Sequence, residues 1–416
     1  MDTLTLRAGP PAHGGACIAR DDGRVVFVHY ALPDELVEVE ARGRRGGAAF
    51  AAATRVLEPS PDRVEPPCPH FGTCGGCHWQ HARYSAQLEL KRAATAETWQ
   101  RAGLRLPPET PVLGMARPWR YRIRGEFEAA GPPGAVRFGL HRERSHSVLP
   151  LEVCPIHHER IEAGLLAFGQ AVSELGLEHA QTLRLTAEPA GSGLLWDLRF
   201  RGQPRMRAPA ELAARAAELL PGVALLDDSM SLEFLGFTFR VRSDTFVQTN
   251  HRQMLVLYEA ALEMLVARPE ESVLDLYSGI GTLSLAAARH AASVTSVEEN
   301  PRAVQLGRLA TRINGVQNVR FLVGRVESAL KQARLGEHQA AILDPPRAGC
   351  APEALSELLR LQPDRIVYVS CEPSTHARDL ALLVRGGYRV RRAAVVDMFP
   401  QTYHVESVAL LERASA

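Results

Sequence analysis

The chain has 416 residues, of which 46% are hydrophobic, and a formal net charge of +1. A chain of this length exceeds one ordinary core, so two or three domains are expected. We find no signal peptide and no apolar run long enough to span a bilayer, which argues against a membrane protein and predicts a cytoplasmic one. In that compartment the seven cysteines are candidates for metal binding, catalysis or packing, and poor candidates for disulfides.

Short strand-like segments fill the first 58 residues and predict a small β-barrel over 1–58. The stretch "GRVVFVHYALPDELVEVEARG" has two apolar runs separated by a Pro-Asp turn signal. The proline-rich segment "EPSPDRVEPPCP" follows and is typical of a linker. The region that follows, 59–245, is predicted to be a central α+β domain, because its strand-like runs are separated by arginine and glycine.

The basic residues are nearly all arginines, since Lys91 and Lys331 are the only lysines. The segment from residue 117 to residue 144 contains seven arginines and only three glutamates. Arginine forks suit phosphate, so a nucleic-acid-binding face fits this segment. A solvated strand edge fits it equally well.

Four cysteines have the spacing of a metal or cluster site. Cys68, Cys74 and Cys77 lie in "CPHFGTCGGCHWQH", and Cys154 precedes a proline in "EVCPIHH". Four thiolates suit either zinc or an iron–sulfur cluster. Three clustered cysteines with a remote Cys-Pro favour a [4Fe–4S] cluster, because structural zinc more often takes two close pairs. Zinc remains an alternative because three histidines lie nearby: His70, His78 and His81.

From 246 to 416 strands and helices alternate, which predicts βαβ units and a mostly parallel, Rossmann-like sheet. In "VLDLYSGIGTLSL" Gly279 and Gly281 lie between a strand and a helix, and Asp275 precedes them. A second strand ends in Glu298, as in a dinucleotide-binding fingerprint. The third glycine that a pyrophosphate requires is missing, so the pattern favours S-adenosylmethionine over NAD.

Two further strands of this domain end in reactive side chains. "AILDPPRAGC" ends its strand at Asp344, which two prolines hold at the sheet edge. "IVYVSCEPST" ends its strand at Cys371, because the proline two residues later stops the strand. Ligands bind at this edge of open α/β sheets, whereas a lone cysteine is often only packing. The carboxylate and the thiol together favour a site.

These motifs together resemble the RNA uracil-5-methyltransferases over almost the whole chain. The resemblance includes the cysteine motifs, "SDTFVQTN" at 243–250, "DLYSGIGT", "DPPRAG", "VSCEPST" and "DMFPQTYHVESVALL". It implies a TRAM-like, OB-like barrel over 1–58 that binds RNA, an iron–sulfur domain over 59–245 and a class I methyltransferase domain over 246–416. The barrel and the cysteines are similar to those of the 23S rRNA enzymes, because the bacterial tRNA enzymes lack both.

The resemblance also implies residue roles. Cys371 is the nucleophile: its thiolate adds to uracil C6 and turns C5 into a carbon that can attack a methyl sulfonium. Glu406 is the base that then removes the C5 proton; from the sequence alone it would be an exposed strand-edge acid. The implied cofactor positions are Gln248, Tyr277, Gly279, Gly281, Glu298 and Asp344. The implied [4Fe–4S] ligands are Cys68, Cys74, Cys77 and Cys154, with a structural or RNA-positioning role.

Two positions depart from the family pattern. Thr282 stands where Gly-x-Gly is often followed by asparagine, and Ile123 stands where Tyr-Arg is often followed by asparagine. The first change affects one expected cofactor contact, and the second an RNA or internal hydrogen bond.

The expected partner is RNA, with 23S rRNA first; no DNA, no membrane and a monomeric chain are expected. A tRNA uracil enzyme or an rRNA cytosine-5 enzyme would use the same thiolate chemistry, although cytosine enzymes generally place their nucleophile in another motif. A radical enzyme would need Cys-x3-Cys-x2-Cys, whereas this chain has Cys-x5-Cys-x2-Cys. A non-catalytic RNA-binding protein would not account for Cys371, Asp344 and Glu406 together.

Overall fold

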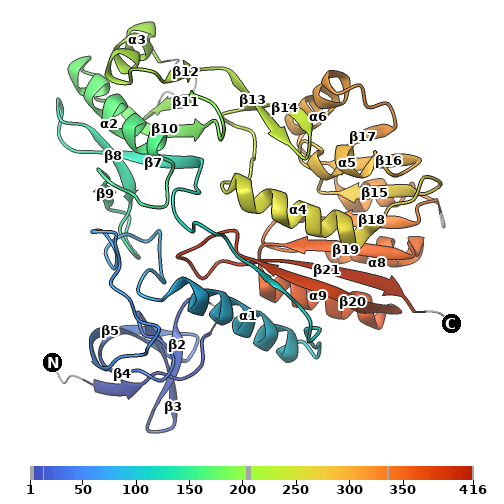
Figure 1. Ribbon diagram of the computed structural model, residues 1–416, viewed down its shortest axis with the longest axis horizontal. Helices are drawn as coiled ribbons and strands as arrows, with labels where there is room; N and C mark the ends of the chain where they lie inside the picture. Colours follow the sequence, from blue (N-terminus) through green and yellow to red (C-terminus); the bar gives the residue numbers. More distant parts are fainter. Residues whose placement is uncertain (1–3, 13, 203–207, 335–336, 415–416) are drawn as a thin grey trace.

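The computed structural model describes residues 4–12, 14–202, 208–334 and 337–414, which form three sheets and a separate hairpin (Figure 1). The sheets have five, six and eight strands. None of the helices in these ranges is long and apolar enough to cross a membrane. The mixed α/β architecture is the one that the sequence predicts.

The N-terminal unit is a five-stranded sheet in the order β1-β4-β5-β3-β2. It closes on itself, because the segment after β1 pairs with β2: the Gly9 amide donates to the Ile18 carbonyl at 2.8 Å, and the Ile18 amide to the Pro10 carbonyl at 2.9 Å. Alternate side chains such as Val26 and Val28 fill its interior. The β-rich N-terminal unit is therefore as predicted. Its strands are β1 (Leu4–Arg7), β2 (Cys17–Asp21), β3 (Arg24–His29), β4 (Leu36–Arg45) and β5 (Ala48–Glu58).

The central unit is a six-stranded sheet in the order β12-β11-β10-β7-β8-β9, with helix α2 packed on β8 and β10 and α3 packed on α2. Its core includes the fully buried Phe127, Phe168 and Leu183. The strands are β7 (Arg124–Ala130), β8 (Arg137–His141), β9 (Val148–Pro150), β10 (Ala180–Ala187), β11 (Gly193–Phe200) and β12 (Ala224–Leu226), and the helices are α2 (Glu159–Glu174) and α3 (Ala210–Leu219).

The C-terminal sheet has the order β17-β16-β15-β18-β19-β21-β20-β6. Only β21 runs against its neighbours, so the sheet is mostly parallel, as predicted. Its strands are β15 (Ser272–Leu276), β16 (Ser293–Glu298), β17 (Val319–Val323), β18 (Ala340–Leu343), β19 (Arg365–Ser370), β20 (Tyr388–Val396), β21 (Glu406–Arg413) and β6 (Val112–Leu113). The associated helices are α5 (Thr282–Ala287), α6 (Pro301–Ile313), α7 (Val326–Leu330), α8 (Pro352–Leu361) and α9 (Pro373–Arg385).

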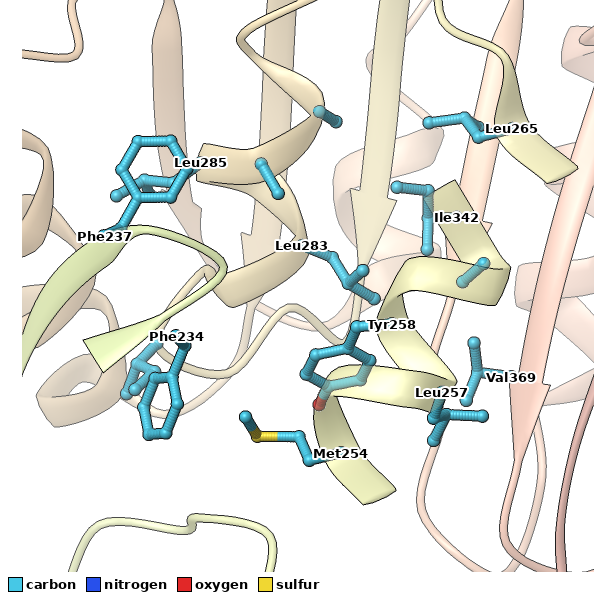
Figure 2. Close-up of a cluster of buried hydrophobic side chains, with 14 of the residues drawn as sticks. Phe234, Phe237, Met254, Leu257, Tyr258, Leu265, Leu283, Leu285, Ile342 and Val369 are labelled. Carbon is cyan, nitrogen blue, oxygen red and sulfur yellow. The ribbon is translucent and has the colours of Figure 1, made fainter. Parts of the chain in front are cut away.

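Helix α4 (His251–Leu265) packs across this sheet, between it and the hairpin of β13 (Ser229–Phe234) and β14 (Phe237–Arg242). The helix begins at Asn250, whose side chain accepts a hydrogen bond from the Gln253 amide at 3.2 Å. Its apolar residues recur every three or four positions and are buried. Figure 2 shows Tyr258 beside Leu283 and Met254 facing the hairpin. The helix thereby fixes the Tyr258 hydroxyl, which lies 3.4 Å from Asp344 Oδ2.

Helix α1 (Tyr84–Arg101) and strand β6 lie in the predicted central segment of the sequence but pack with the C-terminal sheet. Helix α1 contacts α9 and β20, and β6 pairs in parallel with the end of β20. Lys91 of α1 forms an ion pair with Asp397, and both side chains are completely buried. The domain boundaries at 58 and 245 remain predictions, because segments on both sides of residue 245 share one sheet.

We expect Lys91→Met to destabilise the protein by about 3–5 kcal/mol, because it leaves the Asp397 carboxylate buried without its cation. The double variant Lys91→Met/Asp397→Asn should lose less, since it removes both charges. Chemical unfolding followed by the fluorescence of Trp99, a fully buried residue of α1, measures both changes. A single variant as stable as the parent would show that the pair does not hold α1 in place.

Candidate functional site

Several strand ends meet at a cavity of about 760 Å³ at the carboxyl edge of the C-terminal sheet. The residue after β15 is Tyr277, β16 ends at Glu298, the residue after β18 is Asp344 and the residue after β19 is Cys371. Parallel strands bring these positions together although they are spread over almost a hundred residues of sequence. Seven of the eight predicted catalytic and cofactor residues line the cavity: Gln248, Tyr277, Gly279, Glu298, Asp344, Cys371 and Glu406.

The loop from Tyr277 to Gly281 turns sharply, and three of its residues have positive φ angles: Tyr277 (63°), Gly279 (56°) and Gly281 (80°). The Gly279 amide donates to Glu298 Oε2 at 3.0 Å, and the Asn300 amide donates to Oε1 at 2.8 Å. These bonds orient the Glu298 carboxylate toward the cavity, and each oxygen keeps a lone pair for a ligand hydroxyl.

Of the eight predicted catalytic and cofactor residues, Gly281 is the one that does not line the cavity. A Cβ added to Gly281 would lie 2.6 Å from the Phe321 ring. Glycine is needed there because α5 begins at this residue and packs closely against Phe321. The second glycine of the motif therefore serves packing behind the cavity.

Asp275 lies at the floor of the cavity and is nearly inaccessible to solvent. The Ser284 hydroxyl donates a hydrogen bond to its Oδ2, whereas Oδ1 has no hydrogen-bond partner among the described residues. Burial raises the pKa of Asp275 to about 7. A buried carboxylate with one unpaired oxygen is suited to a polar or cationic group of a ligand.

The register of β19 and β21 places Cys371 opposite Glu406. These strands are antiparallel, and their last pair is Ser370 with Ser407, so the next residue along β19 faces the residue before Ser407. Both side chains line the same cavity. The exposed strand-edge acid expected from sequence alone is thus a buried one, with 2% of the Glu406 surface accessible.

The cavity favours the protonated forms of Cys371 and Glu406. Burial, followed by the charges of Glu406 and Asp344, raises the pKa of the Cys371 thiol to about 12. Burial, followed by the charge of Asp344, raises the pKa of Glu406 well above its usual range. Arg347 also lines the cavity, and its positive charge lowers both pKa values. Each of the two acids is therefore a strong base once it is ionised.

A buried histidine links the chain segments that hold the two acids. His376 Nδ1 lies 2.8 Å from the Ser407 hydroxyl oxygen. His376 belongs to α9, which begins two residues after Cys371, and Ser407 follows Glu406. Burial lowers the pKa of His376 to about 3, so the ring is neutral at physiological pH. This contact is a positioning interaction for the Cys371–Glu406 pair.

Gln248 and Asp344 are connected through Tyr258 of α4. The Tyr258 hydroxyl donates to Asp344 Oδ2 at 3.4 Å, and the Gln248 side chain also hydrogen-bonds this hydroxyl. Burial raises the pKa of Asp344 to about 7. The core helix thus sets the position of two lining residues that come from distant parts of the sequence.

Phe246 and Arg347 line the cavity but were not predicted from the sequence as site residues. Phe246 is 77% exposed, a large value for an aromatic ring. A ring at a cavity mouth offers a stacking surface for a planar ligand. The signal for both residues was available, since Phe246 lies in "SDTFVQTN" and Arg347 in "DPPRAG".

The four predicted cluster cysteines come near one another where the loop of residues 68–77 meets the central unit. The loop contributes three of them, and the fourth is Cys154. Burial, followed by the charges of Cys154, Cys74 and Cys68, raises the pKa of the Cys77 thiol to about 12. All are free thiols. The described part of the chain contains no group of three or more histidine, cysteine or acidic side chains arranged to hold a metal ion. The cluster therefore remains a prediction.

The fold and the cavity define an α/β enzyme of the methyltransferase type. The sequence profile described as tRNA (Uracil-5-)-methyltransferase matches residues 214–414. An uncharacterized RNA methyltransferase of Halalkalibacterium halodurans is 34% identical over 99% of this chain and 97% of its own length. A 23S rRNA (uracil(1939)-C(5))-methyltransferase of Alkalilimnicola ehrlichii is 34% identical over 97% of this chain and 95% of its own.

A solved structure has the same fold. The crystal structure of Pyrococcus abyssi tRNA (uracil-54, C5)-methyltransferase with S-adenosyl-L-homocysteine superposes with a TM-score of 0.74, covering 97% of this chain and all of that one, at 21% identity. The chain belongs to the RNA uracil-5-methyltransferase family.

We expect alkylation of Cys371 by iodoacetamide to be slow at pH 7 and to accelerate about tenfold per pH unit toward pH 12, because only the thiolate reacts. Glu406→Gln should increase the rate at alkaline pH by removing a charge that raises the pKa of the thiol. Arg347→Ala should decrease it. Mass spectrometry of the Cys371 peptide measures the rate, with Glu353→Gln on the surface of α8 as the control. A rate independent of pH would contradict the buried, protonated thiol.

Proposed function

We propose that this protein transfers a methyl group from S-adenosylmethionine to C5 of a uridine in RNA, most directly in 23S rRNA. The observation that carries the proposal is the pairing of Cys371 with Glu406 inside the cavity that also contains the glycine loop and Glu298. A thiol and a buried carboxylate at one ligand site are the two groups that this chemistry requires.

The cofactor end of the cavity suits a nucleoside with a cationic sulfur. Glu298, oriented by the Gly279 and Asn300 amides, would accept the ribose hydroxyls. Tyr277 would lie against the adenine, and the buried carboxylates of Asp275 and Asp344 would face the positively charged methionine portion. The cavity volume of about 760 Å³ accommodates a nucleoside and an extruded base.

The residues act in sequence on the uracil ring. Cys371 gives its proton to water and its thiolate adds to C6, which breaks the C5=C6 double bond and makes C5 a nucleophile. C5 then forms a bond to the methyl group as the sulfonium's sulfur–methyl bond breaks, and the donor leaves as a neutral thioether. Ionised Glu406 then removes the remaining proton from C5, the C5=C6 bond re-forms and the Cys371 thiolate leaves. The raised pKa of Glu406 makes its carboxylate a strong base for this last step.

The target base must leave its stack to reach Cys371, because C5 and C6 of a stacked uridine are inaccessible. Phe246 at the mouth offers an aromatic face to such a base or to its neighbour. The 34% identity to the Alkalilimnicola ehrlichii enzyme over 97% of the chain supports 23S rRNA as substrate. A tRNA substrate is the alternative, as for the Pyrococcus abyssi enzyme that shares the fold.

We expect purified protein with labelled S-adenosylmethionine to form 5-methyluridine in a 23S rRNA transcript. Cys371→Ala should abolish the product, because it removes the thiolate that adds to C6. Glu406→Gln should instead accumulate a covalent protein–RNA adduct that carries the methyl group, detected as a band of reduced mobility on denaturing gels. Nucleoside mass spectrometry identifies the product. If the methyl group were found only in tRNA, the proposed substrate would change from 23S rRNA to tRNA. Formation of 5-methylcytidine, or no transfer to either RNA, would overturn the proposal.

We further propose that Cys68, Cys74, Cys77 and Cys154 hold a [4Fe–4S] cluster. Four free thiols suit this group, and after burial the charges of Cys68 and Cys74 raise the pKa of both the Cys77 and the Cys154 thiols. Arg122, whose Nε is buried without a hydrogen-bond partner among the described residues, lowers the pKa of Cys74 and would face the negative charge of a cluster. The group would fix the 68–77 loop against the segment around Cys154; we assign it no part in methyl transfer.

Protein purified without oxygen should contain about four iron and four sulfide per chain, with visible absorbance from the cluster. Cys77→Ser should lose most of the iron, whereas Cys17→Ser, a buried cysteine of the N-terminal barrel, should keep it. One zinc per chain and a colourless protein would assign the site to zinc instead.

A further inference from the structure

Helix α9 begins two residues after Cys371, and one of its faces is bonded to a neighbouring loop, residues 347–350. The side chains on this face are three and four positions apart, so they lie together on one side of the helix. They are Thr375, Arg378 and Asp379. The loop lies between β18 and α8, and its first residue is Arg347. Cys371 and Arg347 are therefore attached to the same helix.

Two side chains of this face bond the backbone carbonyls of the loop. The Thr375 hydroxyl donates to the Arg347 carbonyl at 3.0 Å. Arg378 Nη2 donates to the Ala348 carbonyl at 3.0 Å and to the Cys350 carbonyl at 3.4 Å. The backbone of the loop is thus held from both of its ends.

Asp379 completes the contact from the interior, where its side chain is inaccessible to solvent. Its Oδ2 accepts hydrogen bonds from the Cys350 amide at 2.8 Å and from the Tyr368 hydroxyl at 2.6 Å. Its Oδ1 accepts one from Arg378 Nε at 2.8 Å. Tyr368 belongs to β19, three residues before Cys371. One buried carboxylate therefore joins the loop, the strand that precedes Cys371 and the helix that follows it.

The loop approaches α9 so closely that it requires a glycine. Gly349 has a φ of +76°, and a Cβ added to it would lie 2.6 Å from both Arg378 Nη2 and Asp379 Oδ2. A side chain at this position would push the loop away from the helix. The glycine of "DPPRAG" thus permits the contact between the loop and α9.

The side chain that this loop carries into the cavity is Arg347. Its positive charge lowers the pKa values of Cys371 and Glu406, whereas the charges of Glu406 and Asp344 raise the pKa of the Cys371 thiol. Coulomb energies vary inversely with distance and are largest where water is excluded. A displacement of the loop would therefore change how well the cavity stabilises the thiolate.

We propose that Asp379 is a positioning residue that fixes the loop to α9 and so keeps the Arg347 guanidinium in the cavity with Cys371. The inference rests on the proposed function for the role of Cys371 as nucleophile. Asp379 is not among the described residues that line the cavity, so it acts through the loop. A purely structural role would account for its burial and its ion pair, but would predict no effect on the thiol that depends on Arg347.

The test measures the rate at which iodoacetamide alkylates Cys371 in the full chain at pH 9, by mass spectrometry of the Cys371 peptide. Asp379→Asn has one acceptor oxygen where the carboxylate has two, so it cannot keep its bonds to both the loop and Arg378. We expect this variant to react about three- to tenfold more slowly, because the thiolate loses part of the positive charge that stabilises it.

A second variant and a matched control accompany it. Thr375→Val, which removes only the bond to the Arg347 carbonyl, should slow alkylation less than Asp379→Asn does. Asp364→Asn changes an exposed aspartate that pairs with Arg413 at 2.6 Å, at the opposite end of β19, and should react as the parent does. Thermal unfolding checks that each variant is folded.

A double variant separates positioning from general loosening of the fold. If Asp379 acts through Arg347, the two effects are not additive, and adding Asp379→Asn to Arg347→Ala should change the rate by less than about twofold. Additive effects would overturn the positioning role. If Asp379→Asn does not fold, Thr375→Val is compared in the same way in the parent and in the Arg347→Ala background.

The outcomes also distinguish this inference from the proposed function, because alkylation requires neither RNA nor a methyl donor. An unchanged or faster rate in the folded Asp379→Asn and Thr375→Val variants would overturn the positioning role even if uridine methylation is observed. Slower, non-additive alkylation in a protein that methylates no uridine would support the positioning of Arg347 and refute the proposed function.

Discussion

The arrangement of the catalytic cavity depends on one fully buried ion pair, between Lys91 of α1 and Asp397 at the end of β20. An unpaired charge in a protein interior costs several kcal/mol, so neither partner can leave without the other. Lys91 also donates to the Phe399 carbonyl at 3.0 Å, and the Tyr84 hydroxyl donates to Asp397 Oδ2 at 2.8 Å. The chain that follows β20 is thereby fixed to a helix from the first hundred residues.

This segment, 397–405, leads directly to Glu406, and elements from distant parts of the sequence hold it. The Gln401 carbonyl accepts the amides of His78 and Trp79 at 2.8 and 3.0 Å. The side chains and backbone of Gln87 and Gln401 pair reciprocally: Gln87 Nε2 donates to Gln401 Oε1, and the Gln401 amide to Gln87 Oε1, both at 2.9 Å. His78 follows Cys77 directly, so the cysteine loop is hydrogen-bonded to the segment that leads to Glu406. The position of Glu406 thus depends on contacts from distant parts of the chain and not on the C-terminal sheet alone.

The part of the site that follows from strand ends was predictable from sequence, and the part that depends on remote contacts was not. The glycine loop after β15 and the polar residues after β18 and β19 meet at one edge of the sheet, because parallel strands share their direction. The alternation of strands and helices along the sequence is enough to predict this arrangement. Glu406 was predictable only through family resemblance, because its burial depends on the antiparallel insertion of β21 between β19 and β20. No local sequence pattern predicts that α1 packs on the C-terminal sheet. The one indication is the residue type at position 91: only two of the 48 basic residues are lysines, so a lysine there is consistent with a specific contact. The spacing of the motifs identified the four cysteines as one site. The [4Fe–4S] cluster that they would hold remains a proposal, because the described side chains are not arranged around a metal ion.

Under the proposed function, the electrostatics of the cavity link binding of the methyl donor to the ionisation of Cys371. Asp275, Asp344, Cys371 and Glu406 all line it, and burial raises the pKa of each. Arg347 offsets only part of this effect, so the free cavity favours neutral acids and an unreactive thiol. A sulfonium in the same cavity stabilises the ionised form of every one of these groups, because opposite charges attract strongly where water is excluded. Under the proposed function the thiolate of Cys371 thus becomes accessible when the donor is bound, and addition to uracil is favoured at the moment when C5 has a methyl group to attack.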